Sequence, residues 1–376
     1  MQMINFNSFS DFNKLCDIYK LQKIPKLERD KPVWIFGAGN FAQDICNIIK
    51  QENFDFKGFI VSSATQNEVL GFPVKNLSEF NLDGEDLQLV FGVLNREAKF
   101  NVIENDIKQR GFSKILMPWH VYTQFESSLG WRYWLSNPNT ILNSLFKIQK
   151  TYDLLDDDVS KQCLLNICAF RLGVNQDYAS FMHLENQYFN QITLPFFNNK
   201  SIKYVDMGAY NGDTVIELSQ KVDNLTDAYL FEPDIDNFND LVSAVDKSEI
   251  NTLCLPLGVS DKSEILSFST GCGEGSAISD NGNVHIATVA LDDFLIKHDV
   301  NFIKMDIEGA EILAIKGAKK TIKRCRPVLA ISYYDKPGDI WEIPLLLQQY
   351  CKSYKFYLRQ HYYNSFESVL YAIPVN

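Results

Sequence analysis

A glycine loop in the second half of the chain has the residue types of a nucleotide-binding turn. It follows an apolar run, Ile202–Asp206, and it opens a helical pattern. Glycine lets the backbone approach a ligand closely, and a carboxylate such as Asp206 can hold an ammonium group. We therefore expect this loop to bind the amino-acid part of a ligand. Its candidate binding residues are Asp206, Gly208, Ala209, Gly212, Asp213 and Thr214.

A second acid, Glu232, follows the next apolar run and is followed by Pro233. It lies about 20 residues beyond the glycine loop, the spacing at which an acid accepts the ribose hydroxyls of a bound nucleotide. The loop and the acid together predict a ligand in which adenosine is joined to a charged amino acid. A pyrophosphate-linked ligand is not indicated by this pair.

The region from about Tyr188 to the C-terminus resembles the FkbM-type methyltransferases. This resemblance implies a class I methyltransferase fold and S-adenosyl-L-methionine as the cofactor. It also implies O-methylation, for this chain most simply of a hydroxyl on a sugar or glycan precursor. The stretches that carry it are Tyr204–Thr214, Phe231–Asp234, Ala290–Leu295 and Phe302–Glu311, followed by Gly317 and Ala318.

Two alternatives to sugar O-methylation stay open. One is N- or C-methylation of another small molecule, because the cofactor motif does not report the acceptor. The other is a nucleotide-sugar-binding protein with a degenerate methyltransferase domain. The intact set of Asp206, Gly208, Gly212 and Glu232 argues against degeneration.

Three residues are candidates for removing the proton of a hydroxyl acceptor. Asp306 and Glu308 follow the apolar run Phe302–Met305, where ligands of open α/β sheets bind. His361 has an ordinary pKa near neutrality, which suits a base. Glu308 can equally charge the start of the next helix, and His361 can equally be structural. A subgroup of the resembling family has histidine where this chain has Asp335, so no catalytic role is carried over to Asp335.

No metal ligands are predicted, because the chain lacks the spacing of a metal motif.

The first half of the chain has a glycine loop of its own, Gly37-x-Gly39-x-x-Ala42, after the apolar run Val33–Phe36. A dinucleotide site also needs an acid after the second strand, and Ser62 stands there instead. NAD chemistry is therefore the least expected role, while helix packing and ligand binding stay open as alternatives. The segment also resembles the N-terminal domain of bacterial sugar-amine acetyltransferases, which implies a nucleotide-linked sugar bound at Gly37 and Gly39.

Short apolar runs that alternate with helical patterns predict an α/β fold with parallel sheets. We expect two Rossmann-like, doubly wound domains, at 1–119 and 196–376, joined by a helical connector at 120–195. The second domain should end in an antiparallel strand pair. The strands expected there are 202–206, 228–231, 252–257, 302–305 and 328–332, with helices or loops between them, and then 355–360 and 368–373.

Composition excludes several classes of partner. The net charge is −11, and no stripe of Lys and Arg appears, so nucleic acid is not expected to bind. No apolar run is long enough to cross a bilayer, and the start of the chain lacks the pattern of a secretory signal. The eight cysteines form no CxxC pair, which favours reduced thiols. We therefore expect a cytoplasmic protein without a membrane span, and homo-oligomerisation stays open.

Overall fold

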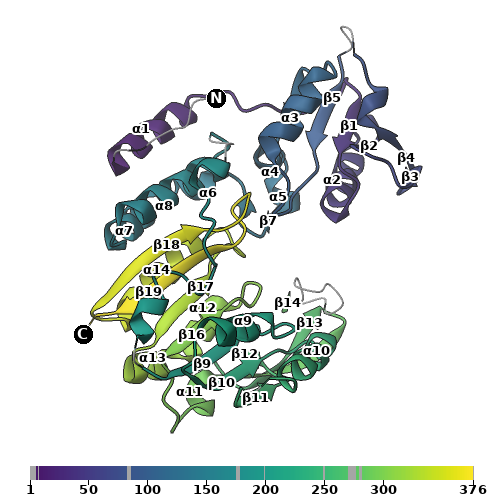
Figure 1. Ribbon diagram of the computed structural model, residues 1–376. Coiled ribbons are helices and arrows are strands. Elements are labelled where there is room, and N and C mark those ends of the chain that lie inside the picture. The colour runs from purple at the N-terminus through teal and green to yellow at the C-terminus, as the bar shows by residue number, and fades with distance from the viewer. Residues whose placement is uncertain are drawn as a thin grey trace. The chain divides into compact units, whose positions relative to one another are not determined.

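Two α/β units divide the chain between them (Figure 1). The computed structural model describes residues 6, 8–82, 86–174, 178–198, 200–248, 250–269, 277–278 and 282–375. The first unit comprises Met1–Leu145, Gln162–Met182 and Tyr362–Phe366, and the second comprises Phe146–Lys161, His183–His361 and Glu367–Asn376. Segment 120–195 therefore contributes to both units, and the three-part division expected from the sequence remains a prediction. The units are described separately below.

A six-stranded sheet in the order β3-β4-β2-β1-β5-β6 forms the centre of the first unit. Its neighbours pair in parallel except at the edge, where β3 and β4 are antiparallel. This doubly wound order confirms the Rossmann-like fold predicted for this part. The strands are β1 (Val33–Phe36), β2 (Phe56–Val61), β3 (Glu68–Val69), β4 (Phe72–Asn76), β5 (Gln88–Phe91) and β6 (Lys114–Leu116).

Helices cover this first sheet because each presents one apolar face. In α2 (Asn40–Gln51), Phe41, Ile45 and Ile49 are buried, at the four-residue spacing of one helix face. The other helices of the unit are α1 (Phe9–Lys20), α3 (Phe100–Gln109), α4 (Pro118–Gln124), α5 (Glu126–Leu129), α6 (Asn139–Leu142) and most of α8 (Asp158–Arg171). The two-stranded β7 (Trp131–Arg132) and β8 (Leu135–Ser136) complete it.

The second unit is built on a seven-stranded sheet in the order β11-β10-β9-β16-β17-β19-β18. The first five strands are parallel, and β19 lies antiparallel between β17 and β18. This arrangement confirms the expected class I methyltransferase fold with its C-terminal strand pair, the yellow strands of Figure 1. The strands are β9 (Ile202–Met207), β10 (Leu225–Phe231), β11 (Thr252–Leu255), β16 (Phe302–Met305), β17 (Val328–Ser332), β18 (Tyr354–Gln360) and β19 (Ser368–Pro374).

A four-stranded sheet in the order β12-β15-β13-β14 is inserted between β11 and β16. The sequence led us to expect helices or loops there. Strands β13 and β15 are only partly buried, so their apolar and polar residues alternate weakly. The strands are β12 (Gly258–Val259), β13 (Glu264–Ser269), β14 (Ala277–Ile278) and β15 (Val284–Val289).

Helices flank the seven-stranded sheet, and aromatic residues fill the core of the second unit. Tyr204, Phe189 and Phe197 all pack against Phe302 on β16. The helices are α7 (Leu145–Leu154), α9 (Asp213–Lys221), α10 (Ile235–Val245), α11 (Leu291–Phe294), α12 (Glu311–Gly317), α13 (Lys319–Cys325) and α14 (Asp339–Tyr350). Among the helices of the described residues, none is long and apolar enough to cross a membrane.

Candidate cofactor and acceptor site

The loops that follow β9 and β16 meet at the carboxyl edge of the second sheet. The two strands pair in register, with Asp206 opposite Lys304. Helices leave neighbouring strands in opposite directions at such a switch point, which opens the crevice where α/β proteins bind ligands. Gly208 and Asp306 touch there so closely that a Cβ on Gly208 would lie 1.9 Å from the Asp306 carbonyl oxygen. Only glycine fits at position 208.

Both loops contain residues with left-handed backbone. In the β9 loop, Gly208, Tyr210 and Gly212 have φ of 87°, 48° and 84°. In the β16 loop, Glu308 and Gly309 have φ of 53° and 94°. A non-glycine residue with positive φ is strained, and such strain concentrates at functional sites.

Hydrogen bonds hold the glycine loop beside β10. The amides of Gly208 and Ala209 both donate to the carbonyl oxygen of Phe231, at 3.0 and 2.9 Å. Gly212 caps α9, and Thr214 donates its amide to the Asp213 carboxylate at 2.6 Å. Asp213 is exposed, whereas Thr214 is half-buried. The loop predicted to bind the cofactor is therefore a compact turn at a helix N-terminus.

Glu232 lies at the end of β10 and is 5% exposed. Its Oε2 accepts the amide of Tyr210 and its Oε1 accepts the amide of Asp234, each at 2.9 Å. Burial raises the pKa of this carboxyl to about 7, against the lowering effect of these hydrogen bonds. Glu232 thus ties the glycine loop to the end of β10, and the half-buried Pro233 follows it.

Asp206 is fully buried, and its carboxylate faces Lys304. The Lys304 ammonium lies 3.0 Å from Asp206 Oδ1 and donates to the carbonyl oxygen of Gly208 at 2.6 Å. Tyr204 donates its hydroxyl to Asp206 Oδ2 at 2.9 Å. Burial alone would lower the pKa of Lys304, but the carboxylates of Asp206 and Asp306 outweigh it and raise that pKa. In this arrangement Asp206 supports the glycine loop through Lys304. The binding of a ligand ammonium by Asp206 stays a prediction.

Sequence reasoning missed Lys304, although a signal was present. A lysine inside the apolar run of a central parallel strand is unusual, because both faces of such a strand are buried.

Asp306 is held by two tyrosine hydroxyls. Tyr188 donates to its Oδ2 at 2.9 Å, and Tyr334 donates to its Oδ1 at 3.4 Å. Burial, together with the Asp306 carboxylate, raises the pKa of both tyrosines well above the usual value. Both phenols therefore stay protonated and act as donors. Neither tyrosine was identified from the sequence, because Tyr188 lies 118 residues from Asp306 and no local pattern connects them.

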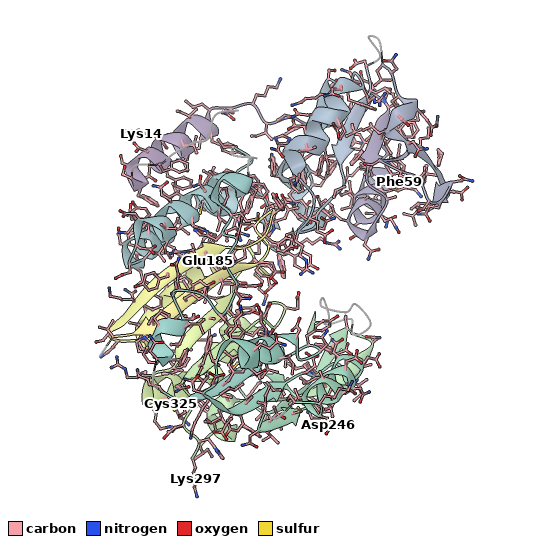
Figure 2. All side chains as sticks on the ribbon, viewed as in Figure 1. Lys14, Phe59, Glu185, Asp246, Lys297 and Cys325 are labelled. Carbon is pink, nitrogen blue, oxygen red and sulfur yellow. The ribbon has the colours of Figure 1, made fainter. Side chains whose placement is uncertain are left out.

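The other predicted catalytic residues lie in different surroundings. Glu308 is half-buried in the loop that Asp306 begins. His361 Nε2 lies 2.7 Å from the Tyr371 hydroxyl, and its Nδ1 lies 3.2 Å from the carbonyl oxygen of Glu185. Figure 2 shows Glu185 beside the C-terminal strands β18 and β19. Burial lowers the pKa of His361 to about 4. A neutral imidazole with both nitrogens engaged is suited to a structural role, so the geometry adds no support to His361 as the base.

In the first unit, the two loop glycines differ in their surroundings. Gly37 has φ of 107°, and a Cβ there would lie 2.6 Å from the Gly92 carbonyl oxygen. Gly39 is the N-cap of α2, and a Cβ there would meet nothing within 4 Å. Packing thus explains Gly37 but not Gly39, and ligand binding at this loop stays a prediction.

Comparison with known proteins gives the second unit a family. A family model described as the methyltransferase FkbM domain matches residues 206–363, which include both loops of the site. Residues 206–363 are an FkbM methyltransferase domain. The chain is therefore a methyltransferase, as the four sequence stretches implied.

The fold is also that of a solved structure, methyltransferase FkbM from Methylobacillus flagellatus KT. The TM-score is 0.76 at 19% sequence identity, and the alignment covers 97% of this chain and 99% of that one. This likeness extends over both units and concerns the fold. A search of proteins with curated functions found no match.

Proposed function

We propose that this methyltransferase transfers the methyl group of S-adenosyl-L-methionine to a hydroxyl of a sugar or glycan precursor. The β9 loop and Glu232 hold the cofactor in this proposal, and Asp306 receives the acceptor hydroxyl. The observation that carries it is the Asp306 carboxylate, oriented by Tyr188 and Tyr334 beside Gly208. The sugar is proposed from the family resemblance alone.

Glu232 has the chemistry to hold an adenosine. A carboxylate offers about four lone-pair positions. The amides of Tyr210 and Asp234 and the side chain of Asn237 use three of them. A ribose hydroxyl can donate to the position that remains or can replace Asn237. The other cofactor contacts proposed are with Gly208, Ala209, Gly212, Asp213, Thr214 and Pro233.

The bound cofactor supplies a methyl group that is already activated as a sulfonium. The protein must position the acceptor and take its proton, since a neutral alcohol is a weak nucleophile. Asp306 can accept this proton at a carboxylate oxygen as the new C–O bond forms. Tyr188 and Tyr334 keep the carboxylate in place throughout, because their hydroxyls remain protonated.

Calorimetric titration tests the cofactor assignment. The protein should bind S-adenosyl-L-methionine and S-adenosylhomocysteine at micromolar concentrations, and Glu232→Ala should weaken both by at least about tenfold. Failure of the wild type to bind either compound would refute the proposal. NAD and UDP-sugars belong in the same titration, because a nucleotide-linked sugar is also proposed to bind at Gly37 and Gly39 of the first unit.

Asp306→Asn tests the base. It should lower kcat at least about a hundredfold while leaving cofactor affinity within about twofold, since the amide keeps the shape but takes no proton. Unchanged turnover would show that another group removes the proton.

Cytoplasmic action and the domain limits at 119 and 195 are likewise proposed. Cell fractionation would check the first, and limited proteolysis would check the second.

A further inference from the structure

Asp335 is a buried acid that the fold does not explain. It follows β17 and is 4% exposed, yet neither of its carboxyl oxygens has a hydrogen-bond partner among the residues that the structure describes. Buried polar groups are almost always paired, because an unpaired one is costly, and a buried charge needs a compensating charge. An acid kept at such a position indicates a ligand.

The acids around Asp335 do have structural partners. Glu311 Oε1 accepts the amides of Ile307 and Gly309 at the start of α12, at 2.9 and 3.4 Å. Asp339 Oδ2 accepts the amide of Lys336 at 2.9 Å, before α14. These carboxylates hold the loops that precede α12 and α14, whereas neither Asp335 oxygen has such a partner among the described residues.

The surroundings of Asp335 are strongly negative. Carboxyls of Glu311, Glu308, Asp306 and Asp339 all repel its charged form, and with burial as the larger cause they raise its pKa well above the usual range. Burial, with Asp339 close by, also raises the pKa of Glu311 to about 8. A cation at this position would relieve the repulsion and allow Asp335 to ionise.

An ammonium already lies against this cluster. Lys336 donates its Nζ to the carbonyl oxygen of Gly309. From the point where a Cβ on Gly309 would lie, Lys336 Nζ is 3.6 Å away and Asp335 Cβ is 3.7 Å away. Lys336 and Asp335 thus both lie against Gly309, in a loop where Glu308 has the strained φ of 53°. A ligand ammonium can take the position of the Lys336 ammonium if the flexible lysine side chain moves.

Asp335 is linked to Asp306 through the chain and through its charge, because the Asp306 carboxyl is among those that repel it. Its neighbour in sequence, Tyr334, donates its hydroxyl to Asp306. A ligand that reaches both carboxylates therefore needs both a hydroxyl and a cationic group. Among the described residues, no group of three or more His, Cys, Asp or Glu side chains has the arrangement of a metal site, which favours an organic cation.

We infer that the methyl acceptor carries a protonated amino group, as an amino sugar does, and that Asp335 receives this ammonium while Asp306 receives the hydroxyl. The inference rests on the proposed function, because it names the class of its acceptor. It makes Asp335 a specificity-determining residue, a role that neither the sequence nor the family comparison assigns to it.

Paired acceptors test the inference. Each pair consists of a primary amine and its neutral counterpart, such as glucosamine and N-acetylglucosamine, and methyl transfer from labelled S-adenosyl-L-methionine is followed at pH 7. The wild type should methylate the amine at least about tenfold faster in kcat/KM, and Asp335→Asn should remove this preference through a higher KM. Asp236→Asn, which neutralises an exposed acid in the first turn of α10, should keep the preference.

A binding measurement separates this inference from a purely structural role. Ammonium binding should make Asp335 ionise, so calorimetry in buffers of different ionisation enthalpy should detect proton release by the wild type with S-adenosylhomocysteine present. Asp335→Asn should abolish this release.

Three outcomes would each overturn the inference. They are equal use of amine and neutral acceptors, no transfer to any amine, and unchanged selectivity in Asp335→Asn. If the sulfur nucleosides themselves fail to bind, the proposed function falls instead. If Mg²⁺ or Mn²⁺ binds at Asp335 and the amines do not, the site is a metal site and the inference is wrong.

Discussion

At the scale of single residues, the position of Asp306 depends on donors from distant parts of the chain. Tyr188 precedes the whole seven-stranded sheet, and Tyr334 follows β17. The sequence placed Asp306 directly after an apolar strand, and in the structure it follows β16. The sequence did not predict the two tyrosines, because only the folded sheet brings them to one carboxylate.

Tyr188→Phe should lower kcat by about tenfold, because it removes the shorter of the two hydrogen bonds that orient Asp306. Cofactor affinity should change less than about twofold. Steady-state rates and calorimetry would measure both. The matched control is Tyr357→Phe, whose hydroxyl donates to Asp156. An unchanged kcat in Tyr188→Phe would show that Asp306 keeps its orientation without this donor.

Glu232 should make the ligand-free protein less stable as pH rises. Its pKa is about 7 in the folded protein and 4.5 in the unfolded reference, so the folded state holds the extra proton between these values. The stabilising contribution of Glu232 is therefore largest below pH 4.5, and this contribution is lost as pH rises through 7.

Glu232→Gln removes the titrating carboxyl and with it this pH-dependent contribution to stability. Between pH 5 and 8, the free energy of unfolding of the wild type should fall by about 1–3 kcal/mol more than that of the variant. Denaturant titrations at several pH values would measure it, with Asp236→Asn as the exposed control. Parallel curves for wild type and Glu232→Gln would contradict the buried position of this carboxyl.

At the scale of elements, the strands were the most predictable part. Strands 33–36, 302–305 and 328–332 have the limits expected from their apolar runs. Both faces of these strands are buried, so almost every residue had to be apolar. The small sheet between β11 and β16 was missed because it is half-exposed. The ion pair between Asp206 on β9 and Lys304 on β16 was missed, because it depends on the register in which the two strands pair.

Lys304→Met should lower the free energy of unfolding by about 3–5 kcal/mol, since it leaves the buried Asp206 carboxylate without its cation. The double variant Asp206→Leu/Lys304→Met should recover most of this loss, because no buried charge remains. Urea titration of the three proteins would give the coupling. A single variant as stable as the wild type would mean that Asp206 is buried as a neutral acid.

At the scale of the whole molecule, the two units share the end of the chain. Residues 362–366 belong to the first unit, and β19 belongs to the second. The assignment of these two segments to different units was not predictable from local patterns, because residues far apart in sequence complete each unit. The predicted limits at 119 and 195 follow changes in composition, whereas the units follow contacts.

A chain that stops after Gln360 should therefore lose cooperative unfolding in both units. It lacks β19, which pairs with both β17 and β18, and it lacks Asn364, which donates to the carbonyl oxygens of Asn95 and Ala98 in the first unit. Circular dichroism during thermal unfolding would show this. The control chain stops after Pro374 and should unfold like the wild type. A cooperative transition in the shorter chain would show that the first unit completes itself without residues 362–366.

The place of β19 inside the sheet also bears on synthesis. The ribosome synthesises β17 before β19, so β17 has an open edge until β19 emerges. During that interval β17 is a buried-type strand without its neighbour, the kind of edge that pairs with other chains. The protein is thus exposed to aggregation between the synthesis of β17 and that of β19, and a ribosome that slows between these two strands prolongs that exposure.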